Sequence, residues 1–184
     1  MAVDTGCRKV YRHYPLANIA IYNGVTLVHY ALGAAGIVMG YSRWSLLAWT
    51  VGLIYLVFAL GQMYVLMPLV VCPSCAYRRI DGARCVSAMN LVSARIAPLA
   101  DPEEFARRAQ GVFCHNHLYM ASLIAPLVLI VPALIVAFSW IVLALLLAVA
   151  ALLALRLFVV FPRVACGLCA ARGRCPNANA MGLT

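Results

Sequence analysis

Residues 118–161 read LYMASLIAPLVLIVPALIVAFSWIVLALLLAVAALLALRLFVVF, an apolar stretch whose one charged residue is Arg156. A helix that crosses about 30 Å of hydrocarbon needs about 20 apolar residues, so this stretch is roughly twice too long for one span. It must fold back on itself, and Phe138-Ser139-Trp140 is the expected turn because tryptophan favours the membrane interface. The stretch therefore predicts two spans, at about 118–138 and 140–162.

The same type of pattern occurs earlier in the chain. Apolar runs predict two more spans, at about 16–40 and 44–71. Of the 184 residues, 66% are hydrophobic, well above the roughly 45–50% of soluble domains. Residues 1–14 contain no apolar segment followed by a small-residue cleavage site, so no cleavable signal peptide is expected. The predicted fold class is an all-α integral membrane protein with four transmembrane helices.

The formal net charge of +9 comes from 14 lysine and arginine residues against five acidic ones, and all of the basic residues except Arg156 lie outside the expected spans. They lie before the first span, between the second and third, and after the fourth, whereas the other two connections hold only Arg43. The positive-inside rule then places both termini and the middle loop in the cytoplasm, as for a multi-pass protein of the inner (cytoplasmic) membrane. Contact with lipid headgroups accounts for these charges. No nucleic-acid partner is expected, because no aromatic-interleaved basic platform is present.

The chain also reads as two copies of one two-helix unit, residues 1–115 and 116–184. Each copy opens with a similar segment, VYRHYPL at 10–16 and VFCHNHL at 112–118, and each ends its second span in Cys-x-x-Cys. A two-span unit returns to its starting side, so the copies are expected to be parallel repeats about an axis along the membrane normal. Short cytoplasmic surface helices are expected in the middle loop, at 83–96 and from Asp101 to about Gly111.

The eight cysteines all lie outside the expected spans and on the expected cytoplasmic side. They divide into two sets of four. One set contains three cysteines of the first copy, and the other contains three cysteines of the second. Cys7 and Cys114 supply the fourth cysteine of each set. The first-copy residues are Cys72, Cys75 and Cys85, and the second-copy residues are Cys166, Cys169 and Cys175.

Cytoplasmic thiols stay reduced, so structural disulfides are disfavoured and metal binding is expected. Four thiolates suit zinc or an iron–sulfur cluster. Cys72-Pro73-Ser74-Cys75 is similar to a zinc knuckle, whereas Cys175-Pro176 is similar to the Cys-Pro that ends many ferredoxin ligand runs. Duplication in a membrane scaffold favours two iron–sulfur clusters, of the four-iron type, because two centres at one face make an electron path. Zinc is the alternative.

Histidines offer other ligands at the same face. A Cys₃His site would use a histidine in place of the variable cysteine, and the candidates are His13, His115 and His117. The competing interpretation is an interfacial histidine that bonds headgroups or backbone.

Ionisable residues inside spans are costly and are functional candidates. His29, Tyr30 and Arg156 are the candidates for binding a quinone. The simpler interpretations are a helix–helix hydrogen bond for His29 and snorkelling of Arg156 to lipid phosphate. Gly33, Gly36 and Gly40 follow the small-residue spacing that allows close helix packing.

In architecture, paired Cys-x-x-Cys units on four spans resemble the small membrane subunits of respiratory redox complexes, although no motif is shared. The resemblance implies a membrane-anchoring electron-transfer subunit that passes electrons between a soluble cytoplasmic redox protein and membrane quinone. Such a subunit belongs to a hetero-oligomeric complex and performs no catalysis alone. The alternatives are a zinc-stabilised scaffold without redox activity, and a thiol oxidoreductase or metal-ion transfer protein.

Overall fold

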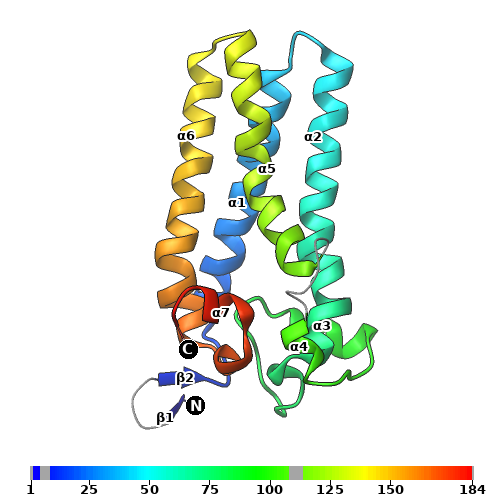
Figure 1. Cartoon of the computed structure of the whole chain (residues 1–184), viewed down its shortest axis with the longest axis vertical. Helices are drawn as coiled ribbons and strands as arrows, with labels where there is room; N and C mark the ends of the chain where they lie inside the picture. Colours follow the sequence, from blue (N-terminus) through cyan, green and yellow to red (C-terminus); the bar gives the residue numbers. More distant parts are fainter. Residues whose placement is uncertain (1, 5–8, 108–113, 184) are drawn as a thin grey trace.

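The computed structural model describes residues 2–4, 9–107 and 114–183. Four long helices lie side by side, and the short elements gather at one end together with both ends of the described chain (Figure 1). Two of the long helices are α1 (Leu16–Gly40) and α5 (His115–Val136). The other two are α2 (Ser45–Leu60), which continues as η1 (Gly61–Val71), and α6 (Trp140–Leu155), which continues as η4 (Arg156–Ala165).

All four helices are long and apolar enough to cross a membrane. Their outward faces carry large apolar side chains that are more than half exposed, among them Trp49, Ile135 and Phe158. Such faces suit lipid rather than water. The prediction of four transmembrane helices is therefore confirmed at the level of length and composition. The predicted turn at 138–140 is confirmed too, because α5 ends at Val136 and α6 begins at Trp140.

The short elements form the end of the molecule that carries the cysteines. An antiparallel hairpin precedes α1, and short helices follow each long hairpin (Figure 1). The elements are β1 (Ala2–Asp4), β2 (Lys9–Tyr11), η2 (Cys72–Ser74), η3 (Ala76–Arg78), α3 (Met89–Ile96), α4 (Glu104–Arg107), η5 (Cys166–Leu168), η6 (Arg172–Arg174) and α7 (Pro176–Ala180).

The middle loop holds surface helices, but the first is shorter than expected. The expected helix at 83–96 begins only at Met89, because Ala88 adopts a left-handed conformation with φ 60°. The Asn90 side chain instead accepts the Cys85 N–H at 3.1 Å, which stabilises a turn before the helix. The second helix, α4, begins at Glu104 after Asp101 accepts the Glu103 N–H at 2.9 Å. Its expected end at Gly111 lies outside the described residues.

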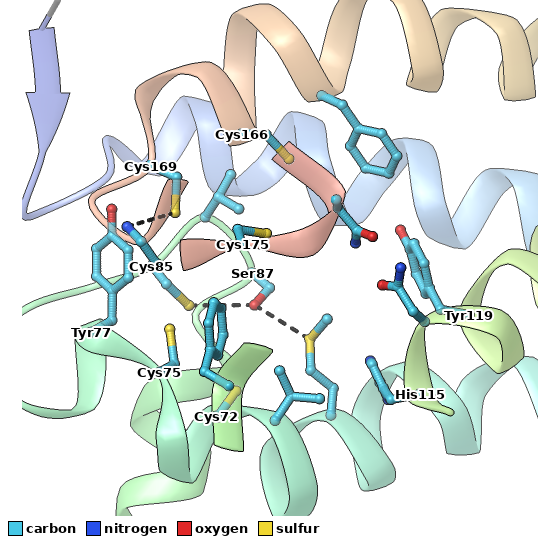
Figure 2. Close-up of a pocket in the computed structure, with 18 of the residues that line it drawn as sticks. Cys72, Cys75, Tyr77, Cys85, Ser87, His115, Tyr119, Cys166, Cys169 and Cys175 are labelled. Atoms are coloured by element: carbon cyan, nitrogen blue, oxygen red, sulfur yellow. Dashed lines mark hydrogen bonds between the residues drawn. The ribbon is translucent and has the colours of Figure 1, made fainter. Parts of the chain in front are cut away.

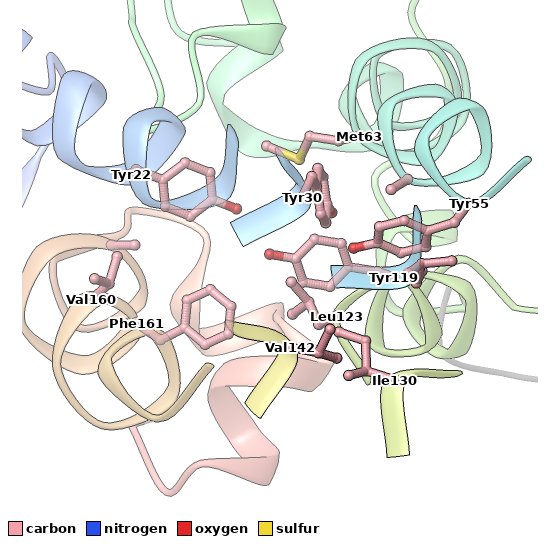
Figure 3. Packing of buried hydrophobic residues seen from close by; sticks show 13 residues of the cluster. Tyr22, Tyr30, Tyr55, Met63, Tyr119, Leu123, Ile130, Val142, Val160 and Phe161 are labelled. Carbon is pink, nitrogen blue, oxygen red and sulfur yellow. The ribbon is translucent and has the colours of Figure 1, made fainter. Parts of the chain in front are cut away.

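Helices α1 and α5 pack closely against each other at the centre of the bundle. A Cβ atom added at Gly33 would lie 2.8 Å from Pro126 Cβ, and one at Gly40 would lie 2.8 Å from Ala133 Cβ. At Gly36 the nearest atom would be Ile130 Cδ1 at 2.5 Å. The expectation of close packing at these glycines is confirmed. Around this contact lies the buried apolar cluster, which includes Tyr30, Tyr55, Leu123 and Ile130 (Figure 3).

Prolines in α5 interrupt its hydrogen-bond ladder, and a tyrosine of the first hairpin satisfies the carbonyl left over at Pro126. Pro126 has no N–H to give to the Ser122 carbonyl one turn earlier. Tyr55 donates its hydroxyl to that carbonyl at 3.3 Å. Tyr41 donates to the Leu129 carbonyl at 2.9 Å, three residues before Pro132. Hydrocarbon offers no water to these carbonyls, so their hydrogen bonds have to come from the protein. The two tyrosine bonds connect the two hairpins inside the bundle.

The glycine contacts give a test of the packing. Gly33→Ala should destabilise the protein by about 1–3 kcal/mol, since the new methyl group meets a rigid proline ring. Gly24→Ala in the same helix is the matched control, because nothing lies within 4 Å of its Cβ position. It should stabilise slightly through helix propensity. Unfolding in detergent monitored by circular dichroism measures both, and equal effects would contradict the packing account.

Candidate metal centre

Six cysteines line one cavity of about 140 Å³ at the end of the bundle where the short elements gather. Three come from the loop after the first hairpin and three from the loop after the second (Figure 2). They are Cys72, Cys75, Cys85, Cys166, Cys169 and Cys175. Phe105 of α4 also lines the cavity, so the middle-loop helix covers part of it. The fold thus brings together two cysteine groups that are far apart in sequence.

The two Cys-x-x-Cys segments adopt the same local geometry. In each, the second cysteine donates its N–H to the carbonyl of the first, at 3.1 Å for Cys75 to Cys72 and 3.2 Å for Cys169 to Cys166. Both second cysteines then have extended backbone, with ψ of 144° and 132°. These turns bring both cysteines of each pair to the cavity wall.

The helix that leads into each turn is widened. Both η1 and η4 are π-helical, and each contains a proline four residues before its first cysteine, Pro68 and Pro162. A proline removes a ladder bond and crowds the preceding turn, and a wider helical turn accommodates this. At the second Cys-x-x-Cys the widened turn brings the Pro162 carbonyl against Gly167, where a Cβ atom would lie only 2.0 Å away. This position of the second Cys-x-x-Cys therefore requires glycine.

Tyr77 joins the two cysteine loops to the N-terminal segment. Its hydroxyl donates to the Tyr11 carbonyl at 2.6 Å and accepts the Ala170 N–H at 3.1 Å. Tyr11 in turn forms a parallel bridge with Cys169. One buried side chain of the first loop therefore holds both the second loop and the strand before α1.

Tyr14 adds a second tie between the same segments. Its backbone N–H donates to the Arg84 carbonyl at 2.9 Å, and its hydroxyl donates to the Ala165 carbonyl at 2.5 Å. Ala165 directly precedes the second Cys-x-x-Cys. Burial raises the pKa values of both Tyr14 and Tyr77, and the neighbouring Cys169 thiol raises them further. Both phenols therefore remain protonated donors in these bonds.

The sulfur atom of Cys169 lies in a poorly solvated setting. Burial raises the pKa of the Cys169 thiol, and the nearby thiols of Cys75, Cys166 and Cys175 raise it further. The Ala171 N–H, which donates to Cys169 Sγ at 3.4 Å, acts in the opposite direction. A negative charge on this sulfur therefore needs a positive charge close by.

The thiols surround the cavity instead of converging on one point. Among the seven cysteines that the structure describes, none forms a disulfide. Within residues 2–4, 9–107 and 114–183, no three Cys, His, Asp or Glu side chains are grouped closely enough to hold a single metal ion. Zinc needs four ligands within about 2.3 Å of its centre. A four-iron cluster is a larger body ligated at its corners, so cysteines spread around a cavity fit it better.

The sequence also predicts three histidines as alternative ligands, His13, His115 and His117. Of these, only His115 lines the cavity. Gln62 donates to His115 Nδ1 at 2.8 Å and to the His115 carbonyl at 3.1 Å, which places the ring proton on Nε2. His13 and His117 are exposed and do not line the cavity.

One cysteine of the described residues lies apart from the six at the cavity. Cys114 is buried outside the cavity lining, and its sulfur accepts the His117 N–H at 3.4 Å as the N-cap of α5. Cys7 lies outside the described residues.

Arg156 lies deeper in the bundle, beyond the aromatic inner wall of the cavity. It is fully buried, so the snorkelling interpretation is wrong. Its guanidinium lies over the rings of three residues at 4.9–5.5 Å and donates to the hydroxyls of Thr26 and Tyr119. The three rings, which also line the cavity, are Tyr22, Tyr119 and Phe161 (Figure 3). All five acidic residues of the chain lie outside the four spans.

His29 and Tyr30 make interhelical contacts. His29 Nε2 donates to the Leu123 carbonyl at 3.0 Å, and Tyr30 shares a 3.0 Å hydrogen bond with the Ser122 hydroxyl. The helix–helix hydrogen bond considered for His29 is therefore present. With Nε2 as donor, His29 Nδ1 is a buried acceptor without a hydrogen-bond partner among the described residues.

Sequence reasoning did not identify Tyr14, Tyr77 or Gln62 as residues of the site. Tyrosine and glutamine carry no spacing pattern, and their importance here follows from contacts between segments more than 50 residues apart. A usable signal for Tyr14 was its place directly before Pro15 and the first span.

The chain matches no protein-family model, no curated protein and no solved structure.

The Tyr77 bonds give a test of how the site is held. Tyr77→Phe should destabilise the cysteine end by about 1–3 kcal/mol, because the Tyr11 carbonyl and the Ala170 N–H both lose a buried partner. Native-state alkylation of Cys85 and Cys169, followed by mass spectrometry, should become faster. Tyr41→Phe removes a comparable bond at the opposite end and should leave these rates unchanged. Equal rates in the two variants would show that Tyr77 does not hold the loops.

Proposed function

We propose that the six-cysteine cavity binds an iron–sulfur cluster and that the protein carries electrons at the membrane surface. The observation that carries this proposal is the convergence of three thiols from each hairpin on one cavity. When bound, such a cluster accepts and releases one electron at a time. The chain supplies the thiols, the N–H donated to Cys169 and mostly apolar walls around them.

We further propose one shared centre in place of the two expected from the sequence. A four-iron cluster needs four thiolates, and the shared cavity offers six. Two such clusters would need all eight cysteines, but Cys114 caps α5 outside the cavity. The matching turns of the two loops support the two-copy description, with each copy contributing ligands to the same centre. The parallel orientation of the copies, and cytoplasmic placement of this end, belong to the same proposal.

In this proposal the protein is a non-catalytic subunit of a membrane oxidoreductase complex. The arginine-rich loops at the cysteine end, among them Arg79, Arg172 and Arg174, form the surface for a soluble redox partner. Membrane quinone is the other electron carrier. Among the polar atoms buried in the spans without a hydrogen-bond partner in the described structure, His29 Nδ1 and Arg156 Nε support a quinone contact in the bundle.

Arg156 provides the positive charge in this scheme. A cation inside a span is costly without an anion, and the spans hold no carboxylate. The rings that cover Arg156 also form the inner wall of the cavity. A cluster held by four thiolates carries net negative charge, so Arg156 and the cluster stabilise each other across this wall.

Metal analysis tests the main proposal. Protein purified without oxygen should contain about four irons per chain with matching sulfide and a broad visible absorption. Cys72→Ser and Cys166→Ser should each lower the iron content of this same centre, whereas Cys114→Ser should keep it. About eight irons, with half lost in each of the first two variants, would establish two centres. Zinc without colour would support the structural scaffold and overturn the proposal.

Arg156 is tested by reduction potential. Ten residues separate Arg156 from Cys166, which is at most about 15 Å along the helix axis, because the widened turns of η4 rise less per residue than an α-helix. At an effective dielectric constant of about 20, a unit charge at that distance contributes on the order of 1 kcal/mol, or about 50 mV for one electron. Arg156→Met should therefore lower the potential, because the oxidised, less negative form gains relative stability.

Arg156→Lys is the charge-preserving control and should restore most of the potential in a spectroscopic redox titration. An Arg156→Met protein with full iron and an unchanged potential would contradict the electrostatic role.

A further inference from the structure

The short helix α3 presents its polar residues to the protein and its apolar residues outward. Asn90 and Ser93 are buried, and the Asn90 amide donates to the Ala83 carbonyl at 2.7 Å. Four large apolar side chains on α3 and just after it are 39–55% exposed. They are Leu91, Val92, Ile96 and Leu99.

This arrangement is the reverse of what water favours. A surface helix of a soluble protein buries its apolar stripe and exposes its polar one. Exposed apolar side chains that recur on one face of a short helix are typical of an element that contacts lipid or another apolar surface. We therefore expect the outward face of α3 to contact lipid or another apolar surface. The position of α3 in the molecule indicates which of the two it contacts.

The position of α3 is continuous with the lipid-facing surface. The helix packs against η1, at the foot of the α2–η1 span (Figure 1). Exposed side chains of η1 itself, Leu69 and Val70, belong to that span. α3 also carries the exposed Arg95, and the chain is strongly basic. A cationic helix with an apolar outward face complements a bilayer surface that contains anionic lipid.

We propose that α3 is an interfacial helix that lies in the headgroup–acyl boundary of an anionic bilayer. Leu91, Val92, Ile96 and Leu99 enter the outer part of the hydrocarbon. Arg95 contacts lipid phosphates. This inference depends on the four spans and not on the identity of the bound metal.

The interfacial helix sets the depth of the cysteine cavity. Arg78 donates to the Ala97 carbonyl at 2.9 Å, and the Ala100 N–H donates to the Pro73 carbonyl at 3.3 Å. These bonds connect the end of α3 to the first Cys-x-x-Cys. Because the helix is fixed at the lipid surface, the cavity is held beside the headgroups, within reach of a soluble partner and of a lipid-dissolved carrier.

A single-tryptophan experiment on the full chain tests this proposal. The native tryptophans, Trp44, Trp49 and Trp140, are replaced by phenylalanine, and Ile96→Trp supplies the probe. The protein is reconstituted in vesicles of equimolar phosphatidylcholine and phosphatidylglycerol. Asp81→Trp, at an exposed position of the same loop, is the matched control, and Leu99→Trp is a second probe in case the first variant does not fold.

The indole at position 96 should emit at shorter wavelength than the one at position 81. Brominated lipid should quench it several-fold more strongly, and acrylamide in the water several-fold less. Equal acrylamide quenching at both positions would place α3 in water and overturn the proposal. An indole at 96 shielded from both quenchers would also overturn it, because protein would then cover the helix.

Discussion

The hydroxyl of Tyr77 connects three parts of the chain that are distant in sequence. It bonds the Tyr11 carbonyl before the first span and the Ala170 N–H after the last, while Tyr77 itself belongs to the loop between the two hairpins. The four apolar helices fix where these loops lie along the axis of the bundle, but they do not fix how the loops are arranged relative to one another. The tyrosine bonds supply that arrangement, and the cavity with its six cysteines exists because the loops are held face to face.

The membrane environment makes such ties strong and makes unpaired charge expensive. Tyr55 satisfies the Ser122 carbonyl that Pro126 leaves without a helical donor, and Tyr41 bonds the Leu129 carbonyl, so tyrosines of the first hairpin hold α5 in the bundle. Arg156 is the exception, a buried cation covered by aromatic rings with hydroxyl partners and no carboxylate in any span. The anionic metal centre that we propose on the far side of those rings would give this charge an electrostatic partner.

Much of the fold follows from the sequence, because hydrocarbon imposes simple rules. Span lengths, the turn before Trp140 and the close approach at Gly33 and Gly40 all depend on local apolar runs and residue size, and all were predicted. The helix predicted at 83–96 is longer than the observed one, because the left-handed conformation of Ala88 depends on tertiary contacts. The site was predicted only in composition. That the two cysteine groups share one cavity, with Cys114 outside it, depends on long-range contacts that spacing does not reveal.

The central claim is one iron–sulfur centre shared by both hairpins. Electron paramagnetic resonance of the anaerobically purified, dithionite-reduced protein, with the spin concentration quantified against the protein concentration, tests it most directly. The account predicts about one spin per chain, with the spectrum of a single isolated cluster. Two interacting spins per chain, or a colourless zinc protein with no signal, would contradict it.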